Sequence, residues 1–174
     1  MNIILIGMPG CGKSTLGVIL AKMLGMDFLD SDVFIQNNEK RKLQEIISTD
    51  GNERFLEIEK ENILKINVDN TVIATGGSVV LKEEAVKHLK NNGKFVFIDV
   101  PYRVLKKRIF NLDSRGIAME DGQTIKDIYN LRLPYYKKYA DLIIKSGSDT
   151  KNDTIKKAIT LIRKQILNKG EVNE

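Results

Sequence analysis

The chain has 174 residues, of which 42% are hydrophobic and 29% are charged, and its formal net charge is +5. This length favours a single domain, and the hydrophobic content is sufficient for a core. No run approaches the roughly 20 apolar residues of a membrane-spanning helix, and a single cysteine excludes an internal disulfide framework. One cysteine and one histidine also leave no plausible zinc cluster. We therefore expect a cytoplasmic protein that does not associate with membranes, and we take a monomer as the working expectation.

The positive charge does not indicate a nucleic-acid partner. Lysines are spread along the chain and mixed with acids, and only the C-terminal helix is locally basic. Aromatic residues, on which bases would stack, are not interleaved with these lysines. We therefore expect the charge to form a solvated surface that attracts anionic small molecules.

Residues 2–24 combine a strand, a tight loop and a helix. The apolar run 3–6 leads into residues 7–14, here called the phosphate loop, which fit the pattern G-x-x-x-x-G-K-[ST]. In such a loop, backbone N–H groups and the helix N-terminus surround phosphate oxygens. The lysine reaches the β- and γ-phosphates, and the hydroxyl binds Mg²⁺. The predicted nucleotide-binding residues in this segment are Gly10, Cys11, Gly12, Lys13, Ser14 and Thr15.

Cys11 lies inside the phosphate loop, close to the start of the helix, where a thiolate is favoured. A reactive thiol at this position would be protected from alkylation by bound nucleotide. We favour the simpler interpretation, in which the cysteine is a small spacer residue.

The rest of the chain alternates short apolar strands with helices. Further strands are expected at 27–30, 71–74, 95–98 and 141–144. Helices are expected at 33–66 with a break at 49–52, then at 82–91, 102–110, 124–139 and 155–166, with a mobile polar loop at 111–123. Strands that are apolar throughout are buried on both faces, which indicates a parallel sheet between helix layers. We therefore predict one α/β domain over residues 1–168, followed by a frayed tail at 169–174.

The polar residues of this sheet gather where its strands end. Asp30 and Asp32 follow the second strand, Gly76 and Gly77 follow the third, and Asp99 follows the fourth. Ligands of parallel sheets bind beyond the carboxyl ends of the strands. The sequence therefore places a ligand site at this edge, next to the phosphate loop.

A kinase must neutralise the charge that develops on the phosphates and must orient an acceptor hydroxyl. Asp30 is suited to orient Mg²⁺, directly or through water. Alternatively it caps the following helix, a role that Ser31 could also fill. Asp32 could accept a hydrogen bond from the acceptor hydroxyl and possibly its proton, or it is simply an acid in the first helical turn.

Three later features have the same double interpretation. Gly76 and Gly77 would let the backbone approach a ligand closely, or they form a plain tight turn. Arg115 is a candidate lid arginine that closes on the γ-phosphate, or it is a solvated loop residue. Arg132 lies among apolar neighbours, which suggests a partly buried guanidinium that binds a ligand or forms a structural ion pair.

The chain resembles the shikimate kinases in the order and spacing of its motifs, over about residues 2–165. These motifs are the phosphate loop, Asp30-Ser31-Asp32, Asp50-Gly51 before Phe55, Gly76-Gly77, Arg115 and Arg132-Leu133-Pro134-Tyr135-Tyr136. The resemblance implies a three-layer P-loop kinase fold of the nucleoside-monophosphate-kinase type, with a five-stranded parallel sheet in the order 2-3-1-4-5. It also implies substrate-binding helices at about 33–66, a lid at about 111–123, and transfer of the γ-phosphate of ATP to the 3-hydroxyl of shikimate with Mg²⁺.

Matched position by position, the resemblance implies roles for the residues around the nucleotide. Lys13 and Arg115 would touch the phosphates, and Ser14 and Asp30 would serve Mg²⁺. Arg108 would lie against adenine, although an arginine on the surface of a helix is the alternative.

The same matching implies an acceptor site. Asp32 would hold the substrate hydroxyls and would be catalytic together with Lys13 and Arg115. Gly76 and Gly77 would line the site, and Arg132 would grip the substrate carboxylate.

The sequence departs from the family pattern in the acceptor half. Leu56 stands where the family usually has a second carboxylate-binding arginine, and Arg54 is about 200° away around the helix. Glu59, the acid that accompanies this arginine, is retained on the same face as Leu56. Ser78 replaces a third glycine, and the lid reads Arg115-Gly116-Ile117 where the family usually has Arg-Pro-Leu. We include Leu56 and Glu59 among the predicted acceptor-site residues.

Loss of one guanidinium should weaken an anionic substrate by about 1.5–3 kcal/mol, or ~10- to 100-fold. A site with Asp32 and Glu59 negative and Arg132 positive would suit a hydroxylated zwitterion better. The leading prediction is therefore a shikimate kinase, and the second is the same machinery acting on a hydroxy amino acid or a sugar acid. A nucleotide-binding regulator without catalysis is the third, and the presence of Lys13 and Asp32 disfavours it.

Overall fold

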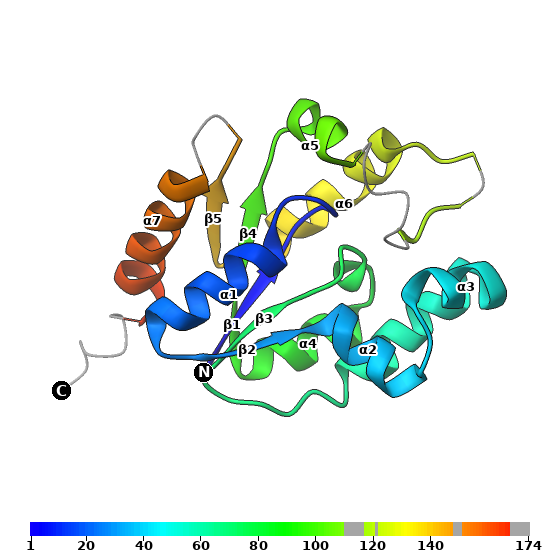
Figure 1. The fold of residues 1–174 in the computed structure, drawn as a ribbon, viewed down its shortest axis with the longest axis horizontal. Coiled ribbons are helices and arrows are strands. Elements are labelled where there is room, and N and C mark those ends of the chain that lie inside the picture. Colours follow the sequence, from blue (N-terminus) through cyan, green and yellow to red (C-terminus); the bar gives the residue numbers. More distant parts are fainter. Residues whose placement is uncertain (110–116, 121, 148–150, 168–174) are drawn as a thin grey trace.

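The computed structural model describes residues 1–109, 117–120, 122–147 and 151–167. One parallel sheet has the strand order β2-β3-β1-β4-β5, which confirms the order implied by the resemblance (Figure 1). The strands are β1 Asn2–Ile6, β2 Asp27–Asp30, β3 Thr71–Ala74, β4 Gly93–Asp99 and β5 Leu142–Lys145. The helices are α1 Lys13–Leu24, α2 Ser31–Glu39, α3 Leu43–Ile63, η1 Val79–Leu81, α4 Glu83–Asn91, α5 Tyr102–Ile109, α6 Ile125–Tyr139, α7 Lys151–Ile162 and η2 Arg163–Leu167. Within the described ranges, no helix is both long and apolar enough to cross a bilayer.

The middle of the sheet is the centre of the core. Every residue of β1 and of β3 is buried, and β1 pairs in parallel with β3 on one side and β4 on the other. The edge strands differ, because β2 has no fully buried residue and Ile143 of β5 is 42% exposed. The expectation that all apolar strands are buried on both faces is therefore wrong at the two edges, where helices cover a strand less completely.

The helices α2 and α3 form a second, smaller core beside the sheet (Figure 1). Its buried members are Ile35, Leu43, Ile46, Phe55, Ile58 and Ala118, with Ile47 and Leu56 packed against them. The expected break within 49–52 is confirmed, because Gly51 has φ of +84° and interrupts α3. This left-handed backbone conformation favours glycine, and it lets the two halves of α3 change direction.

The helix caps explain where two elements begin. Thr124 and Asp127 form a capping box at the start of α6, close to the expected helix start at 124. At the start of α2, the Asp30 side chain accepts hydrogen bonds from two backbone N–H groups, so that this helix begins at Ser31, two residues earlier than expected. The short η1 after β3 is not anticipated by the sequence, because three residues carry no readable periodicity.

Candidate active site

The phosphate loop connects β1 to α1 and is shaped by its glycines. Gly10 and Gly12 have φ of +75° and +99°, a backbone region that other residues rarely adopt. Lys13 is the first residue of α1, and its ammonium donates hydrogen bonds to the carbonyl oxygens of Gly7 at 2.8 Å and Met8 at 3.0 Å. The ammonium is thereby held over the loop, beside the helix N-terminus to which phosphates bind.

The other predicted nucleotide-binding residues of the phosphate loop differ in exposure. Ser14 and Thr15 are exposed on the first turn of α1. Cys11 is only 4% exposed, and its sulfur lies 3.7 Å from the ammonium nitrogen of Lys13. A buried thiol fits the spacer interpretation of Cys11 better than the reactive one.

The end of β2 is tied to the loop that follows β3. The Oδ1 atom of Asp30 accepts hydrogen bonds from the backbone N–H groups of Asp32 at 3.0 Å and Val33 at 3.4 Å. The fully buried Ser31 hydroxyl accepts one from the Gly76 N–H at 3.0 Å. The capping role, which is the alternative for Asp30, is therefore present. Its carboxylate and the Ser14 hydroxyl nevertheless offer the oxygen ligands that Mg²⁺ prefers, so these two residues fit the predicted metal.

Gly76 lies where two carboxylates converge. A β-carbon placed on Gly76 would lie 2.2 Å from Oε1 of Glu59 and 3.0 Å from Oδ1 of Asp32. These oxygens come from α3 and α2, so the two acids lie close together beside the end of β3. The absence of a side chain at position 76 is what makes room for both.

The environment of Glu59 disfavours its charged form. The side chain is 1% exposed, and no donor among the described residues makes a hydrogen bond of normal geometry with either carboxylate oxygen. The pKa of Glu59 is raised to about 7, mainly by burial and to a lesser extent by the charge of Asp32, although Ser78, Arg132 and Lys13 act in the opposite direction. Near neutral pH, Glu59 therefore exchanges readily between its neutral and ionised forms.

Gly77 brings the loop after β3 against α6. A β-carbon placed on Gly77 would lie 2.8 Å from Cδ of Pro9 and 3.2 Å from Nη1 of Arg132. The Arg132 side chain is 3% exposed, and its Nε atom has no hydrogen-bond partner in the described part of the chain. One turn further along α6, the Tyr136 hydroxyl donates a 2.5 Å hydrogen bond to the Gly77 carbonyl oxygen. The phosphate loop, the β3 loop and α6 thus meet at one point.

The segment 117–120 closes the other side of this site. Arg132 donates from Nη2 to the Ala118 carbonyl oxygen at 2.8 Å, and the Asn52 amide donates to the Met119 carbonyl oxygen. Ala118 also packs into the small core of α2 and α3. The end of the predicted lid segment is therefore anchored to both α3 and α6.

The face of α3 that carries Leu56 is apolar. Leu56 is half-buried and packs on the small core, so it supplies no donor to Glu59. Arg54 is exposed and forms an ion pair with Glu61 at 2.9 Å, which confirms that it points away. The guanidinium that the family usually has beside Glu59 is therefore not replaced by Arg54.

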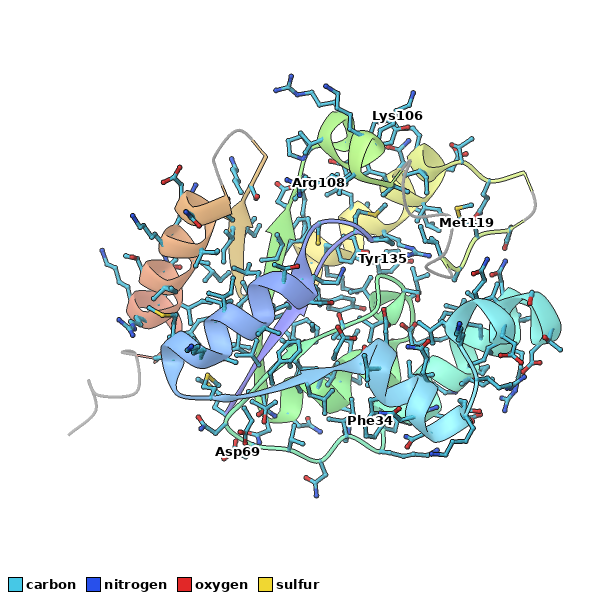
Figure 2. All side chains as sticks on the ribbon, viewed as in Figure 1. Phe34, Asp69, Lys106, Arg108, Met119 and Tyr135 are labelled. Atoms are coloured by element: carbon cyan, nitrogen blue, oxygen red, sulfur yellow. The ribbon has the colours of Figure 1, made fainter. Side chains whose placement is uncertain are left out.

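Two predicted residues stand apart from this cluster. Arg115, with the remainder of 110–116, lies outside the described residues, so its role stays a prediction. Arg108 is exposed on α5 and lies in projection beside the phosphate loop in Figure 2. Its role toward adenine stays a prediction.

Sequence reasoning assigned no role in the site to Tyr136 and considered Ser31 only as a possible helix cap. Both side chains nevertheless hold the elements of the site together. Tyr136 is fully buried, and its ring stacks on Phe97 with 5.2 Å between ring centroids. Its position four residues after Arg132 places both side chains on one face of α6, which is the available signal. A hydrogen bond from Gly76 to Ser31 has no comparable sequence signal.

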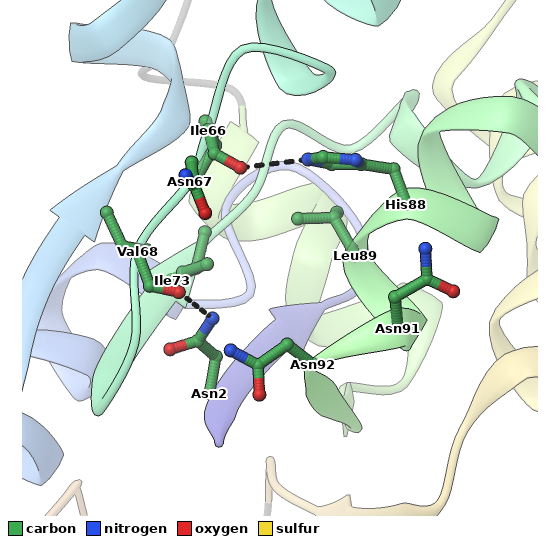
Figure 3. A pocket seen from close by; sticks show the side chains of 9 residues that line it. All are labelled: Asn2, Ile66, Asn67, Val68, Ile73, His88, Leu89, Asn91 and Asn92. Carbon is green, nitrogen blue, oxygen red and sulfur yellow. Dashed lines mark hydrogen bonds between the residues drawn. The ribbon is translucent and has the colours of Figure 1, made fainter.

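A small cavity of about 150 Å³ lies at the opposite end of the sheet (Figure 3). It is lined partly by Asn2, His88 and Asn92. Asn2 donates to the Val68 carbonyl oxygen at 2.7 Å, and the His88 ring hydrogen-bonds to the Ile66 carbonyl oxygen at 2.8 Å. These polar groups already serve the fold, and the cavity is remote from the phosphate loop.

The phosphate loop immediately precedes α1, and the side chains of Asp30, Asp32 and Arg132 lie near the carboxyl ends of the strands. This combination is typical of kinases of the P-loop class. The family model for shikimate kinase matches residues 9–163. A shikimate kinase of Clostridium botulinum (strain Eklund 17B / Type B) is 41% identical over 96% of this chain and 98% of its own. The chain belongs to the shikimate kinase family, and it is an ATP-using phosphotransferase with an alcohol acceptor.

Two solved structures support this assignment. The shikimate kinase of Acinetobacter baumannii in complex with shikimate is 25% identical, with a TM-score of 0.83, over 99% of this chain and 95% of that one. The shikimate kinase of Aquifex aeolicus is 31% identical, with a TM-score of 0.78, over 96% of this chain and 99% of that one. The three-layer fold is therefore shared along almost the whole chain.

Proposed function

We propose that this protein transfers the γ-phosphoryl group of ATP to a hydroxyl of shikimate, with Mg²⁺ on the phosphates. The observation that carries the proposal is that Gly77 adjoins both Pro9 of the phosphate loop and Arg132, while Gly76 beside it adjoins Asp32. The Lys13 ammonium is held over the phosphate loop by the carbonyl oxygens of Gly7 and Met8. A phosphate loop that adjoins the acceptor loop supports direct transfer, which requires the two reacting groups to be held side by side.

The residues divide the reaction between them. Lys13 stabilises the charge that develops on the transferred phosphoryl group, and Arg115 completes this from the lid. Ser14 and Asp30 hold the magnesium ion, which neutralises the phosphates when it is bound. Arg108 lies against adenine.

On the acceptor side, Asp32 orients the hydroxyl and receives its proton. Arg132 binds the shikimate carboxylate, and Gly76 and Gly77 let the ring approach the backbone. Residues 33–66 supply the helices of the acceptor site, and residues 111–123 form the lid that excludes water. We also propose that the protein acts as a monomer in the cytoplasm, on small-molecule substrates and without a nucleic-acid or membrane partner.

The test is shikimate-dependent release of ADP, measured in a coupled assay with ATP and Mg²⁺. Lys13→Met should lower kcat by about 10²- to 10³-fold, in line with loss of one transition-state donor. ADP release that does not depend on shikimate would instead favour a nucleotide-binding regulator. Failure of chelation by EDTA to abolish turnover would contradict the role of Mg²⁺.

A further inference from the structure

Glu59 is a buried acid that the proposed reaction does not use. It is 1% exposed, and neither of its carboxylate oxygens has a hydrogen-bond partner of normal geometry in the described ranges, although Ser78 is near enough to lower its pKa. An ionised carboxylate buried in this way is costly unless a cation or several donors reach it. Leu56, on the same face of α3, is apolar and offers Glu59 neither a hydrogen-bond donor nor a positive charge.

The Glu59 carboxylate lies against Gly76, one of the residues of the proposed acceptor site. Its Oε1 atom and Oδ1 of Asp32 both lie within 3.0 Å of the point where a β-carbon of Gly76 would stand. A β-carbon placed on the next residue, Gly77, would lie 3.2 Å from Nη1 of Arg132. The Nε atom of Arg132 is also buried without a hydrogen-bond partner in the part of the chain that is described. Two carboxyl groups and one guanidinium therefore line adjoining parts of one site.

We propose that the acceptor site also takes a hydroxylated zwitterion, whose ammonium group binds Glu59 and Asp32 and whose carboxylate binds Arg132. The proposal rests on the proposed kinase function, because it uses the same phosphate loop and the same acceptor site. An ammonium group supplies several donors to the oxygens of Glu59, and its positive charge favours the ionised form of this carboxyl beside Asp32. A hydroxy amino acid is the simplest compound with this chemistry.

The reaction on such an acceptor is an ordinary phosphoryl transfer. The bond between the γ-phosphorus and the bridging oxygen of ATP breaks, and a new bond forms between that phosphorus and the acceptor oxygen. The electron pair of the broken bond leaves with ADP. The hydroxyl proton passes to Asp32 and then to solvent, so the products are ADP, a phosphomonoester of the amino acid and one proton.

Two probe compounds isolate the ammonium group. L-homoserine and 4-hydroxybutyrate share the hydroxyl and the carboxylate, and they differ only in the ammonium. We expect kcat/KM for L-homoserine to exceed that for 4-hydroxybutyrate by about 10- to 100-fold, the range of a charge-assisted hydrogen bond. Equal values, or product from neither compound, would overturn the proposal.

Glu59→Gln keeps the size of the side chain and removes its charge. It should reduce the preference for L-homoserine by about tenfold, while Glu61→Gln should leave the preference unchanged. Glu61 is a matched control because it lies on the same helix, is exposed and pairs with Arg54. Leu56→Arg should also reduce the preference, since its guanidinium would occupy the Glu59 carboxylate. An unchanged preference in Glu59→Gln would overturn the role of Glu59.

Shikimate is assayed beside the two probes, so that two failures can be told apart. Turnover of shikimate without discrimination between the probes overturns this inference and leaves the proposed function intact. Turnover of L-homoserine without turnover of shikimate contradicts the proposed function and supports the inference. If the preparation is inactive, isothermal calorimetry with ADP present measures the binding of L-homoserine and 4-hydroxybutyrate directly. Equal affinities for the two probes, or no binding of either, would also overturn the inference.

Discussion

The hydroxyl of Tyr136 donates a 2.5 Å hydrogen bond to the carbonyl oxygen of Gly77. Tyr136 is fully buried on α6, and Gly77 belongs to the loop after β3, so this bond joins two elements far apart in the sequence. Arg132 lies one turn earlier on the same helix, against Gly77. A single contact therefore fixes the loop and the arginine relative to each other.

We expect Tyr136→Phe to lower the free energy of unfolding by about 1 kcal/mol, because the Gly77 carbonyl loses its donor while the stacking on Phe97 remains. The KM for shikimate should rise severalfold. Urea denaturation and steady-state kinetics measure the two effects. Tyr135→Phe is the control, since Tyr135 is 37% exposed and should tolerate the change. Equal effects of both substitutions would contradict this role of Tyr136.

Gly76→Ala should damage the acceptor site and spare the nucleotide site. The new methyl group would lie 2.2 Å from Oε1 of Glu59, so that the two carboxylates must move apart. We expect kcat/KM for shikimate to fall by at least about tenfold, as expected when a small displacement disturbs a reacting group. The affinity for ADP, measured by calorimetry, should be unchanged. A parallel loss of ADP affinity would show that Gly76 serves the whole fold.

Arg132→Lys keeps the charge and removes the planar guanidinium, including its hydrogen bond to Ala118. We expect the KM for shikimate to rise by about 10- to 100-fold and the KM for ATP to remain the same. Steady-state kinetics with each substrate varied in turn measure this difference. Arg54→Lys on the exposed face of α3 is the matched control, and a similar loss there would argue against a specific role for Arg132.

Glu59 should make the protein less stable as the pH rises. Its pKa is about 7 in the folded protein and near 4.5 ordinarily, so between these values the folded state holds a proton that the unfolded state releases. The free energy of unfolding therefore falls as the pH rises from 4.5 to 7 and is constant above 7 with respect to this group. The total change from Glu59 is up to about 3 kcal/mol. Glu59→Gln should remove most of this dependence, as measured by urea denaturation at pH 5 and pH 8. An unchanged difference between the two pH values would show that Glu59 is ionised at both.

The sequence is sufficient to predict the sheet, the phosphate loop and the break at Gly51. Each of these depends on local signals, namely apolar runs, a glycine pattern and a turn cluster. The exposure of Ile143 is not predicted, because an apolar edge strand has the same composition as a central one. The order of the strands came from the family resemblance, since spacing alone does not give it.

The acceptor site shows what sequence reasoning leaves out. The position of Glu59 on the same helical face as Leu56 could be predicted from helical geometry. Its closeness to Asp32 depends on how α2 and α3 pack, and on the space left by Gly76. The contact of Arg132 with Ala118 and the hydrogen bond of Tyr136 to Gly77 join residues that are not neighbours in the sequence, so a local sequence pattern does not predict them.

The most direct test of the account is an experimental structure of this protein with ADP, Mg²⁺ and shikimate bound. We predict that the shikimate carboxylate binds Arg132, that a ring hydroxyl hydrogen-bonds to Asp32, and that this hydroxyl faces Lys13 across the phosphate loop. Shikimate bound elsewhere, or with its carboxylate turned away from Arg132, would contradict the proposed acceptor site.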